Sequence, residues 1–199
     1  MKLSAKHQTY FYLAKNLLVQ FRPSIWFNLL RYKVAIFFIK WMNQANPPFA
    51  PVSATLWVTS ACNKRCSFCH YLTELEEPSN PESMMSLAKF EQIIKDPLIA
   101  KTLRIGFYGG EPLLNPQIFS MIKVAKQRGH LVTINTNGLL IKKYVEELKK
   151  DSPHFFSISY YPEDHKHLEE NLRCLGTNIP LKFNFLLIRE HLQRAQDFF

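Results

Sequence analysis

Three cysteines lie within one stretch of eight residues, at Cys62, Cys66 and Cys69. Thiolates at such close spacing commonly bind zinc or an iron–sulfur cluster. A closed zinc site and an ordinary cluster each use four protein ligands, so three thiolates leave one metal position open. An open position is where a small molecule can bind and react. The spacing therefore predicts an iron–sulfur centre that carries out chemistry at its vacant iron.

A second group of residues has the composition of a ligand-binding turn. Residues 109–112 read Gly-Gly-Glu-Pro and follow a strand-like run. Glycines lack a Cβ, so Gly109 and Gly110 allow the backbone to approach a ligand closely. The alternative is an ordinary tight turn. Thr136 and Asn137 follow the next strand-like run, although the Asn-Gly pair there is also a routine turn signal.

The elements that must position these residues alternate regularly from residue 51 onward. We expect strands over residues 52–60, 103–108, 131–135, 155–159 and 181–188. We expect helices over residues 86–95, 117–128, 139–150, 165–175 and 191–199. Such alternation predicts an α/β fold with parallel strands, either a curved barrel-like sheet or a doubly wound one. In both, the residues that follow the strands gather at one edge of the sheet.

Composition and charge narrow the setting. The net charge is +9, which is compatible with nucleic acid, with an anionic membrane or with a solvated lysine-rich surface. No aromatic RNA-binding platform is present in the sequence, so we do not expect nucleic acid as a partner. No secretory signal is visible. Clustered thiolates must stay reduced, which favours the cytoplasm.

Residues 1–50 differ from the rest because they are aromatic and basic and contain no Asp or Glu. Pro23 separates two helical candidates, and the second spans residues 24–46. Its apolar face combines Phe27, Leu30, Val34, Phe37, Phe38 and Trp41. The longest apolar run is far shorter than the roughly 20 residues that span a bilayer. We expect this amphipathic extension either to pack on the domain that follows or to contact a membrane surface peripherally.

The cysteine motif resembles the signature of the radical S-adenosylmethionine (radical SAM) enzymes. Phe68 supplies the aromatic residue that usually precedes the last cysteine, and Thr59 and Asn63 fit the usual lead-in. The Gly-Gly-Glu-Pro segment is similar to the second motif of the family. The resemblance covers residues 52 to about 195 and implies a partial (β/α) barrel of about five β–α units. Because the family core has six, we expect residues 51–199 to be a radical SAM core that is truncated before the sixth unit.

The resemblance also implies a function. Cys62, Cys66 and Cys69 would hold a [4Fe–4S] cluster that cleaves SAM reductively. The resulting 5′-deoxyadenosyl radical would abstract a hydrogen from an unknown substrate, as an oxidoreductase or a transferase. An electron donor such as a flavodoxin or ferredoxin would be needed. The implied cofactor-binding residues are Phe68, Gly109, Gly110, Glu111, Pro112, Thr136, Asn137 and Ser157.

The sequence is compatible with two alternatives. The chain is also compatible with a non-catalytic iron–sulfur or zinc-binding module that uses its basic surface on nucleic acid or a membrane. A degenerate fragment is the other alternative, and it would bind a cluster without cleaving SAM.

Overall fold

The computed structural model describes residues 51–69, 71, 80–176 and 179–185, and seven residues of one N-terminal helix. Those seven are Phe27, Leu30, Arg31, Lys33, Val34, Ile36 and Phe37. The first N-terminal helical candidate and the helix predicted over residues 191–199 lie outside the described residues.

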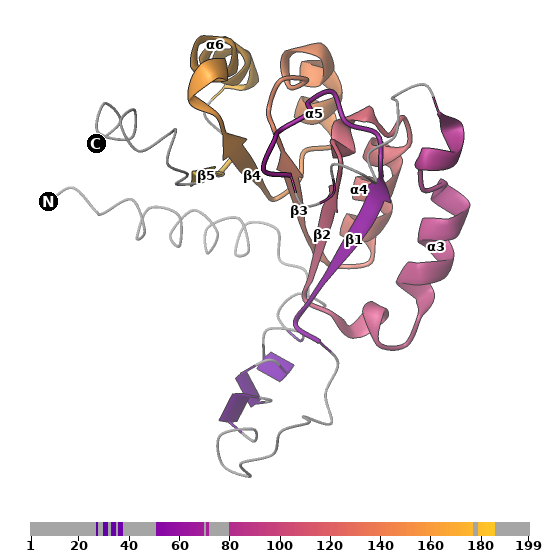
Figure 1. Cartoon of the computed structure of the whole chain (residues 1–199). Helices are drawn as coiled ribbons and strands as arrows, with labels where there is room; N and C mark the ends of the chain where they lie inside the picture. Colours follow the sequence, from indigo (N-terminus) through magenta and orange to yellow (C-terminus); the bar gives the residue numbers. More distant parts are fainter. Residues whose placement is uncertain are drawn as a thin grey trace, which may run out of the picture.

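Five parallel strands form one sheet in the order β1-β2-β3-β4-β5. They are β1 (Ser53–Thr59), β2 (Arg104–Gly109), β3 (Leu131–Thr136), β4 (Phe155–Tyr160) and β5 (Leu181–Phe185). Neighbours in the chain are neighbours in the sheet, and crossovers between parallel strands are right-handed, so all crossovers lie on the same face. The predicted α/β partial-barrel architecture is confirmed (Figure 1).

The helices are α3 (Leu87–Lys95), α4 (Ile118–Gln127), α5 (Val145–Lys150) and α6 (His165–Leu175). The Ser86 hydroxyl accepts a hydrogen bond from the Lys89 amide at 3.2 Å and so caps the start of α3, as predicted. Gly129 and Gly176 follow α4 and α6 with φ of 84° and 80°. Such positive φ angles suit glycine and end a helix. The predicted bounds of α6 are confirmed.

One predicted helix is wrong in its first half. Residues 139–150 do not form one helix, because α5 begins only at Val145. The Asn137 side chain accepts a hydrogen bond from the Leu139 amide at 3.0 Å. The buried Asn171 amide donates to the carbonyls of Gly138 and Leu139, both at 3.1 Å. The Gly138 carbonyl also accepts a hydrogen bond from the Ile141 amide at 3.4 Å, and Lys142–Tyr144 form a 3₁₀ helix, so tight turns tied to α6 precede α5.

The two faces of the sheet differ in chemistry. Apolar strand side chains pack beneath the helices, and the fully buried ones are Val58, Ile105, Phe107, Val132, Ile134, Phe156 and Ile158. The helices close this core with residues that include Phe90, Ile94, Met121 and Leu148. The opposite face carries Thr55, Gly106, Thr133, Asn135, Ser157, Ser159, Lys182 and Asn184. Alternation along each strand therefore places an apolar core on one side and a polar cavity on the other.

The described residues of the N-terminal segment are helical, in agreement with the predicted helix over residues 24–46. Phe27, Leu30, Val34 and Phe37 of its apolar face are exposed. Within the described residues, we find no helix with the length and apolar character required to cross a membrane. The division into an extension over residues 1–50 and a core over residues 51–199 stays a prediction.

Candidate active site at the carboxyl edge of the sheet

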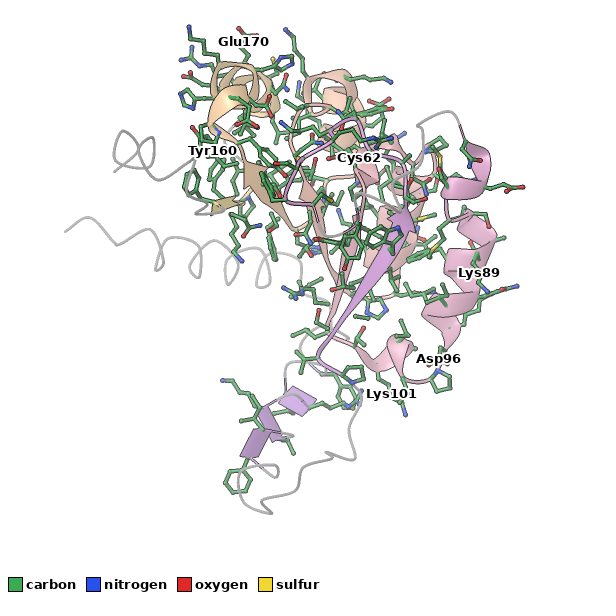
Figure 2. All side chains as sticks on the ribbon, in the orientation of Figure 1. Cys62, Lys89, Asp96, Lys101, Tyr160 and Glu170 are labelled. Atoms are coloured by element: carbon green, nitrogen blue, oxygen red, sulfur yellow. The ribbon has the colours of Figure 1, made fainter. Side chains whose placement is uncertain are left out.

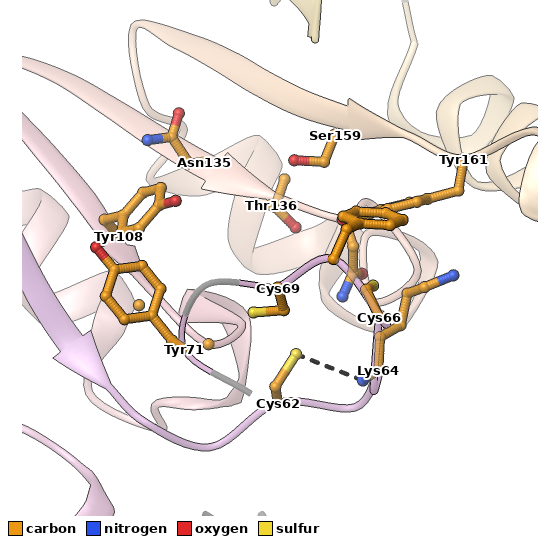
Figure 3. Close-up of a pocket in the computed structure, with 14 residues that line it drawn as sticks. Cys62, Lys64, Cys66, Cys69, Tyr71, Tyr108, Asn135, Thr136, Ser159 and Tyr161 are labelled. Atoms are coloured by element: carbon orange, nitrogen blue, oxygen red, sulfur yellow. Dashed lines mark hydrogen bonds between the residues drawn. The ribbon is translucent and has the colours of Figure 1, made fainter. Parts of the chain in front are cut away.

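The cysteine loop leaves β1 at an irregularity in the sheet. The pairing of β1 with β2 shifts register between Trp57 and Thr59, which redirects the chain as a β-bulge does. Cys62, Cys66 and Cys69 follow as free, half-buried thiols. All three line one pocket of about 210 Å³ (Figure 3). The structure therefore brings the three predicted ligands to a single cavity.

Local hydrogen bonds shape this loop. The Cys69 amide donates to the Cys66 carbonyl at 3.0 Å, and the Lys64 amide donates to the Cys62 sulfur at 3.4 Å (Figure 3). Burial raises the pKa of the Cys62 and Cys66 thiols. The hydrogen bond from the Lys64 amide lowers the pKa of Cys62 in part, and a hydrogen bond from Tyr161 does the same for Cys66.

A lysine within the motif ties the cysteine loop to the loop after β4. Lys64 forms an ion pair with Asp164, and Glu163 lies 3.5 Å from the same ammonium. Burial alone would lower the pKa of Lys64, but the hydrogen bond and charge of Asp164 raise it. The ammonium also lies 4.3 Å from the centroid of the Tyr161 ring. Residues about a hundred positions apart therefore hold this loop together.

Aromatic rings flank the thiols on two sides. Phe68 stacks on Tyr161 with centroids 5.9 Å apart and planes 22° apart. On the other side, Trp57 contacts Tyr71 at 4.4 Å and Tyr108 at 5.9 Å, both edge-on. Tyr71, Tyr108, Phe68 and Tyr161 all line the pocket. Such rings reduce water access around the thiols.

The Gly-Gly-Glu-Pro segment packs directly on the start of the cysteine loop. The Gly110 amide donates to the Thr59 carbonyl, and the Glu111 amide donates to the Ala61 carbonyl, both at 2.8 Å. A Cβ on Gly109 would lie 2.2 Å from the Thr59 oxygen, and one on Gly110 would lie 2.2 Å from the Ala61 oxygen. The contact between the two motifs therefore requires glycine at both positions, whether or not a ligand is bound.

Glu111 lies beneath the pocket rather than in it. Glu111 is fully buried. Its carboxylate accepts hydrogen bonds from the backbone amide of Leu113 at 3.1 Å, and from the Thr136 hydroxyl and the backbone amide of Asn137, both at 2.8 Å. Burial raises the pKa of Glu111 to about 7, although these three hydrogen bonds oppose the rise. Glu111 therefore joins the loop after β2 to the loop after β3. Pro112 is buried beside it, at the start of a short 3₁₀ turn.

The loop after β3 completes the pocket. Thr136 and Asn137 line it, and the side-chain amide of Asn137 donates a hydrogen bond to the side-chain oxygen of Asn63 at 2.7 Å. This bond connects the third loop to the cysteine loop.

Ser157, which the resemblance implied as a cofactor contact, does not line this pocket among the residues described. Its 6% exposed side chain faces the adjoining cavity on the polar face of the sheet.

The structure thus gathers most of the predicted site residues around one pocket. Those that line it are Cys62, Cys66, Phe68, Cys69, Gly109, Gly110, Thr136 and Asn137. Lys64, Tyr71 and Asp164 were not predicted as site residues. The position of Lys64 between two cysteines and of Tyr71 just after the third were the available signals. Nothing in the sequence pairs Lys64 with Asp164.

The chemistry of the donor set fits a cluster. Three free thiols face one cavity, and no fourth cysteine lines it within the described residues. Among these residues, no three His, Cys, Asp or Glu side chains converge on a point that would hold one metal ion. In a cluster each thiolate binds a different iron, so its ligands need not converge in that way. Three thiols at one cavity are a donor set that leaves one iron of a cluster without a protein ligand.

Comparison with known proteins agrees with this site. The family model of the Radical SAM superfamily matches residues 58–161, which is just over half of the chain. The chain belongs to the radical SAM superfamily. Members of this superfamily use a [4Fe–4S] cluster and SAM, and Cys62, Cys66 and Cys69 fit their cysteine motif. The resemblance seen in the sequence is thereby confirmed.

Relatives of this radical SAM chain include GTP 3′,8-cyclases and a cofactor-modifying protein. A probable GTP 3′,8-cyclase of Methanococcus maripaludis (strain C5) is 30% identical over 151 residues, which cover 67% of this chain and 49% of the relative. A GTP 3′,8-cyclase of Clostridium acetobutylicum is 25% identical over 148 residues, covering 66% and 46%. A tungsten-containing aldehyde ferredoxin oxidoreductase cofactor-modifying protein of Pyrococcus furiosus is 29% identical over 123 residues, covering 61% and 33%.

The chain spans about half the length of the first two of these relatives. Among solved structures, archaeal TYW1 has a TM-score of 0.45 and 14% identity, covering 74% of this chain and 59% of that one. A likeness at this level carries no inference about function.

Proposed function

We propose that this chain binds a [4Fe–4S] cluster through Cys62, Cys66 and Cys69 and cleaves SAM reductively. The observation that carries the proposal is the convergence of three half-buried thiols and the Gly109–Gly110 backbone on one pocket. A cluster held by Cys62, Cys66 and Cys69 would supply the electron for reductive cleavage of SAM and so the means to abstract hydrogen from a substrate.

The chain's own residues bind and orient the ligand. Gly109 and Gly110 present backbone to the pocket without a Cβ. Thr136 and Asn137 form the wall on the β3 side, and Glu111 fixes both of them from below. Phe68 shields the thiols from water. Pro112 supports the turn, and Ser157 lines the adjoining cavity, which shares Tyr108, Asn135 and Ser159 with the cysteine pocket.

The direct test is product formation after anaerobic loading with iron and sulfide. With SAM and a strong reductant, the wild-type chain should release 5′-deoxyadenosine. Cys66→Ala should lose the cluster and this release, whereas Cys174→Ala, which removes an exposed thiol on α6, should keep both. Full release by Cys66→Ala would overturn the proposal. A loaded cluster with no release in wild type would instead favour the degenerate-fragment alternative.

The surface charge supports an acidic electron donor. A net charge of +9 steers acidic partners toward the molecule, which suits a small flavodoxin or ferredoxin. A reducing cytoplasm is the proposed location, because the thiolates that hold a cluster must stay reduced. Salt-sensitive reduction of the cluster by such a donor would support this assignment, and reduction that is insensitive to salt would count against it.

The exposed apolar helix residues support a peripheral membrane contact through residues 24–46. Phe27 and Leu30 are 62% and 61% exposed, and residues 1–50 contain Lys and Arg but no acidic residue. A basic helix with an aromatic apolar face binds anionic interfaces. The chain should float with vesicles that contain phosphatidylglycerol, and Leu30→Glu should weaken this binding. Equal recovery with neutral and anionic vesicles would remove the proposal.

A further inference from the structure

The cysteine loop, residues 61–69, is fastened to the ends of the next three strands in turn. The Ala61 carbonyl accepts a backbone hydrogen bond from the loop after β2 at 2.8 Å. The Asn63 side chain accepts a hydrogen bond from the loop after β3 at 2.7 Å. Lys64 then forms its ion pair with Asp164 in the loop after β4. The first residues of the loop therefore carry its anchors to three separate strand ends.

These anchors hold the three cysteines unequally. Cys62 lies between the first two anchors, so the chain is fixed on both sides of it. Cys66 and Cys69 come after Lys64, which carries the last of the three anchors. The Cys69 amide donates to the Cys66 carbonyl at 3.0 Å, so these two residues belong to one turn. The placement of this turn therefore depends on the contact with the loop after β4.

Tyr161 adds the aromatic part of this contact. Its ring stacks on Phe68, the residue before Cys69, with centroids 5.9 Å apart. The Lys64 ammonium lies 4.3 Å from the centroid of the same ring, which is close enough for a cation–π interaction. Figure 3 shows Lys64, Cys66 and Tyr161 together at one end of the pocket. Lys64 thus contacts both a carboxylate and an aromatic ring of the loop after β4.

Burial distinguishes this ion pair from one on the surface. The Lys64 and Asp164 side chains are 16% and 22% exposed, whereas those of Lys149 and Glu146, which pair on α5, are 52% and 78% exposed. An exposed pair contributes little, but removing one partner of a buried pair leaves the other charge uncompensated. Glu163 lies 3.5 Å from the same ammonium, so loss of the ammonium would leave two neighbouring carboxylates without it. Lys64 is therefore the residue on which the contact between the two loops depends.

We propose that Lys64 is a positioning residue, which holds the turn of residues 66–69 over the pocket before any iron binds. The inference rests on the proposed function, because that function gives the turn a cluster to receive. A site whose ligands are already in place binds more tightly, since less conformational entropy is lost on binding. Lys64 therefore strengthens iron binding although it binds no iron itself.

Hydrogen exchange on the full chain without metal tests the placement of the turn. Lys64→Met removes the charge and keeps most of the side-chain volume. Because a charge-assisted hydrogen bond is lost, the amides of residues 66–69 should exchange roughly tenfold faster than in wild type. Lys64→Arg should stay within about threefold of wild type, because its guanidinium can also pair with Asp164. Lys89→Met removes an exposed charge from α3, away from the loop that carries Cys62 (Figure 2), and should leave this rate unchanged.

Iron retention is the second measurement. Wild type and variants are loaded anaerobically with iron and sulfide and are then mixed with an excess of a ferrous chelator. Lys64→Met should release iron roughly tenfold faster than wild type, and Asp164→Asn should also accelerate the release. Because both substitutions break the same contact, the double variant should release iron little faster than Lys64→Met alone.

Faster exchange of residues 66–69 in Lys64→Met, reversed in Lys64→Arg, supports the proposal, and it can be measured even if wild type binds no iron. The proposal is wrong if Lys64→Met exchanges like wild type or if Lys89→Met has the same effect. It is also wrong if exchange rises equally in the core strands, since that would be a general loss of stability. Failure of the proposed function has a separate signature, which is a loaded wild-type chain that releases no 5′-deoxyadenosine with SAM and reductant.

Discussion

The contact between the two motifs makes Gly110 the most informative position for a stability measurement. Gly110→Ala would place a Cβ 2.2 Å from the Ala61 carbonyl oxygen and 2.7 Å from its carbon, both of which are backbone atoms. The backbone cannot rotate away as a side chain can, so the two loops must separate. Separation would break the hydrogen bonds from Gly110 to Thr59 and from Glu111 to Ala61.

The size of the effect follows from these contacts. Two backbone hydrogen bonds contribute about 1 kcal/mol each, and overpacking at such a joint adds about 1–3 kcal/mol. We therefore expect Gly110→Ala to lower the free energy of unfolding by about 3–5 kcal/mol. For a chain of this length, that corresponds to a fall in Tm of roughly 6–20 °C. The loss should also reduce iron retained by the three cysteines, because Ala61 adjoins Cys62.

The assay is urea unfolding followed by circular dichroism, with bound iron measured on the same samples. Gly176→Ala is the matched control, because Gly176 has a φ of 80° but a Cβ there would have no neighbouring atom within 4 Å. It should cost only the backbone strain, about 1 kcal/mol, and leave bound iron unchanged. A Gly110→Ala protein that unfolds within about 1 kcal/mol of wild type would refute the reasoning.

Three further substitutions test other parts of the site. The pKa of Glu111 rises from 4.5 to about 7 on folding, so its contribution to stability is full below pH 4.5 and is lost as the pH rises through 7. The free energy of unfolding of wild type, measured relative to Glu111→Gln, should therefore fall by up to about 3 kcal/mol between about pH 4.5 and 8. A difference between the two proteins that does not change with pH would contradict this. Asp164→Asn weakens the Lys64 ion pair and should cost about 1 kcal/mol at low salt and less in about 1 M NaCl, whereas a cost independent of salt would argue against a charge effect. Asn171→Ala removes the buried side-chain donor from the Gly138 and Leu139 carbonyls and should cost about 1–3 kcal/mol in urea unfolding, and a neutral result would show that this turn does not depend on α6.

Much of the fold could be predicted because its signals are local. Strand alternation, the Ser86 cap and the glycines after α4 and α6 each depend on a few adjacent residues. The cysteine motif and the Gly-Gly-Glu-Pro segment each follow a strand, and parallel strands bring such segments to one edge. The position of the pocket therefore followed from the order of elements alone.

The rest depends on contacts between distant residues. The turn before α5 is tied to Asn171, more than 30 positions away, and the cysteine loop is tied to Asp164, 100 positions from Lys64. The sequence shows that Glu111 can accept hydrogen bonds, but only the structure shows that its donors come from the loop after β3. Ser157 faces the adjoining cavity because of its strand register, which a motif does not reveal.

The central claim is that Cys62, Cys66 and Cys69 hold a four-iron cluster whose remaining iron binds SAM. Electron–nuclear double resonance on the reduced, anaerobic chain with SAM labelled with ¹⁵N at its amino group tests this most directly. We predict a ¹⁵N coupling to the cluster in wild type. A reduced four-iron cluster without that coupling, or no four-iron signal at all, would contradict it.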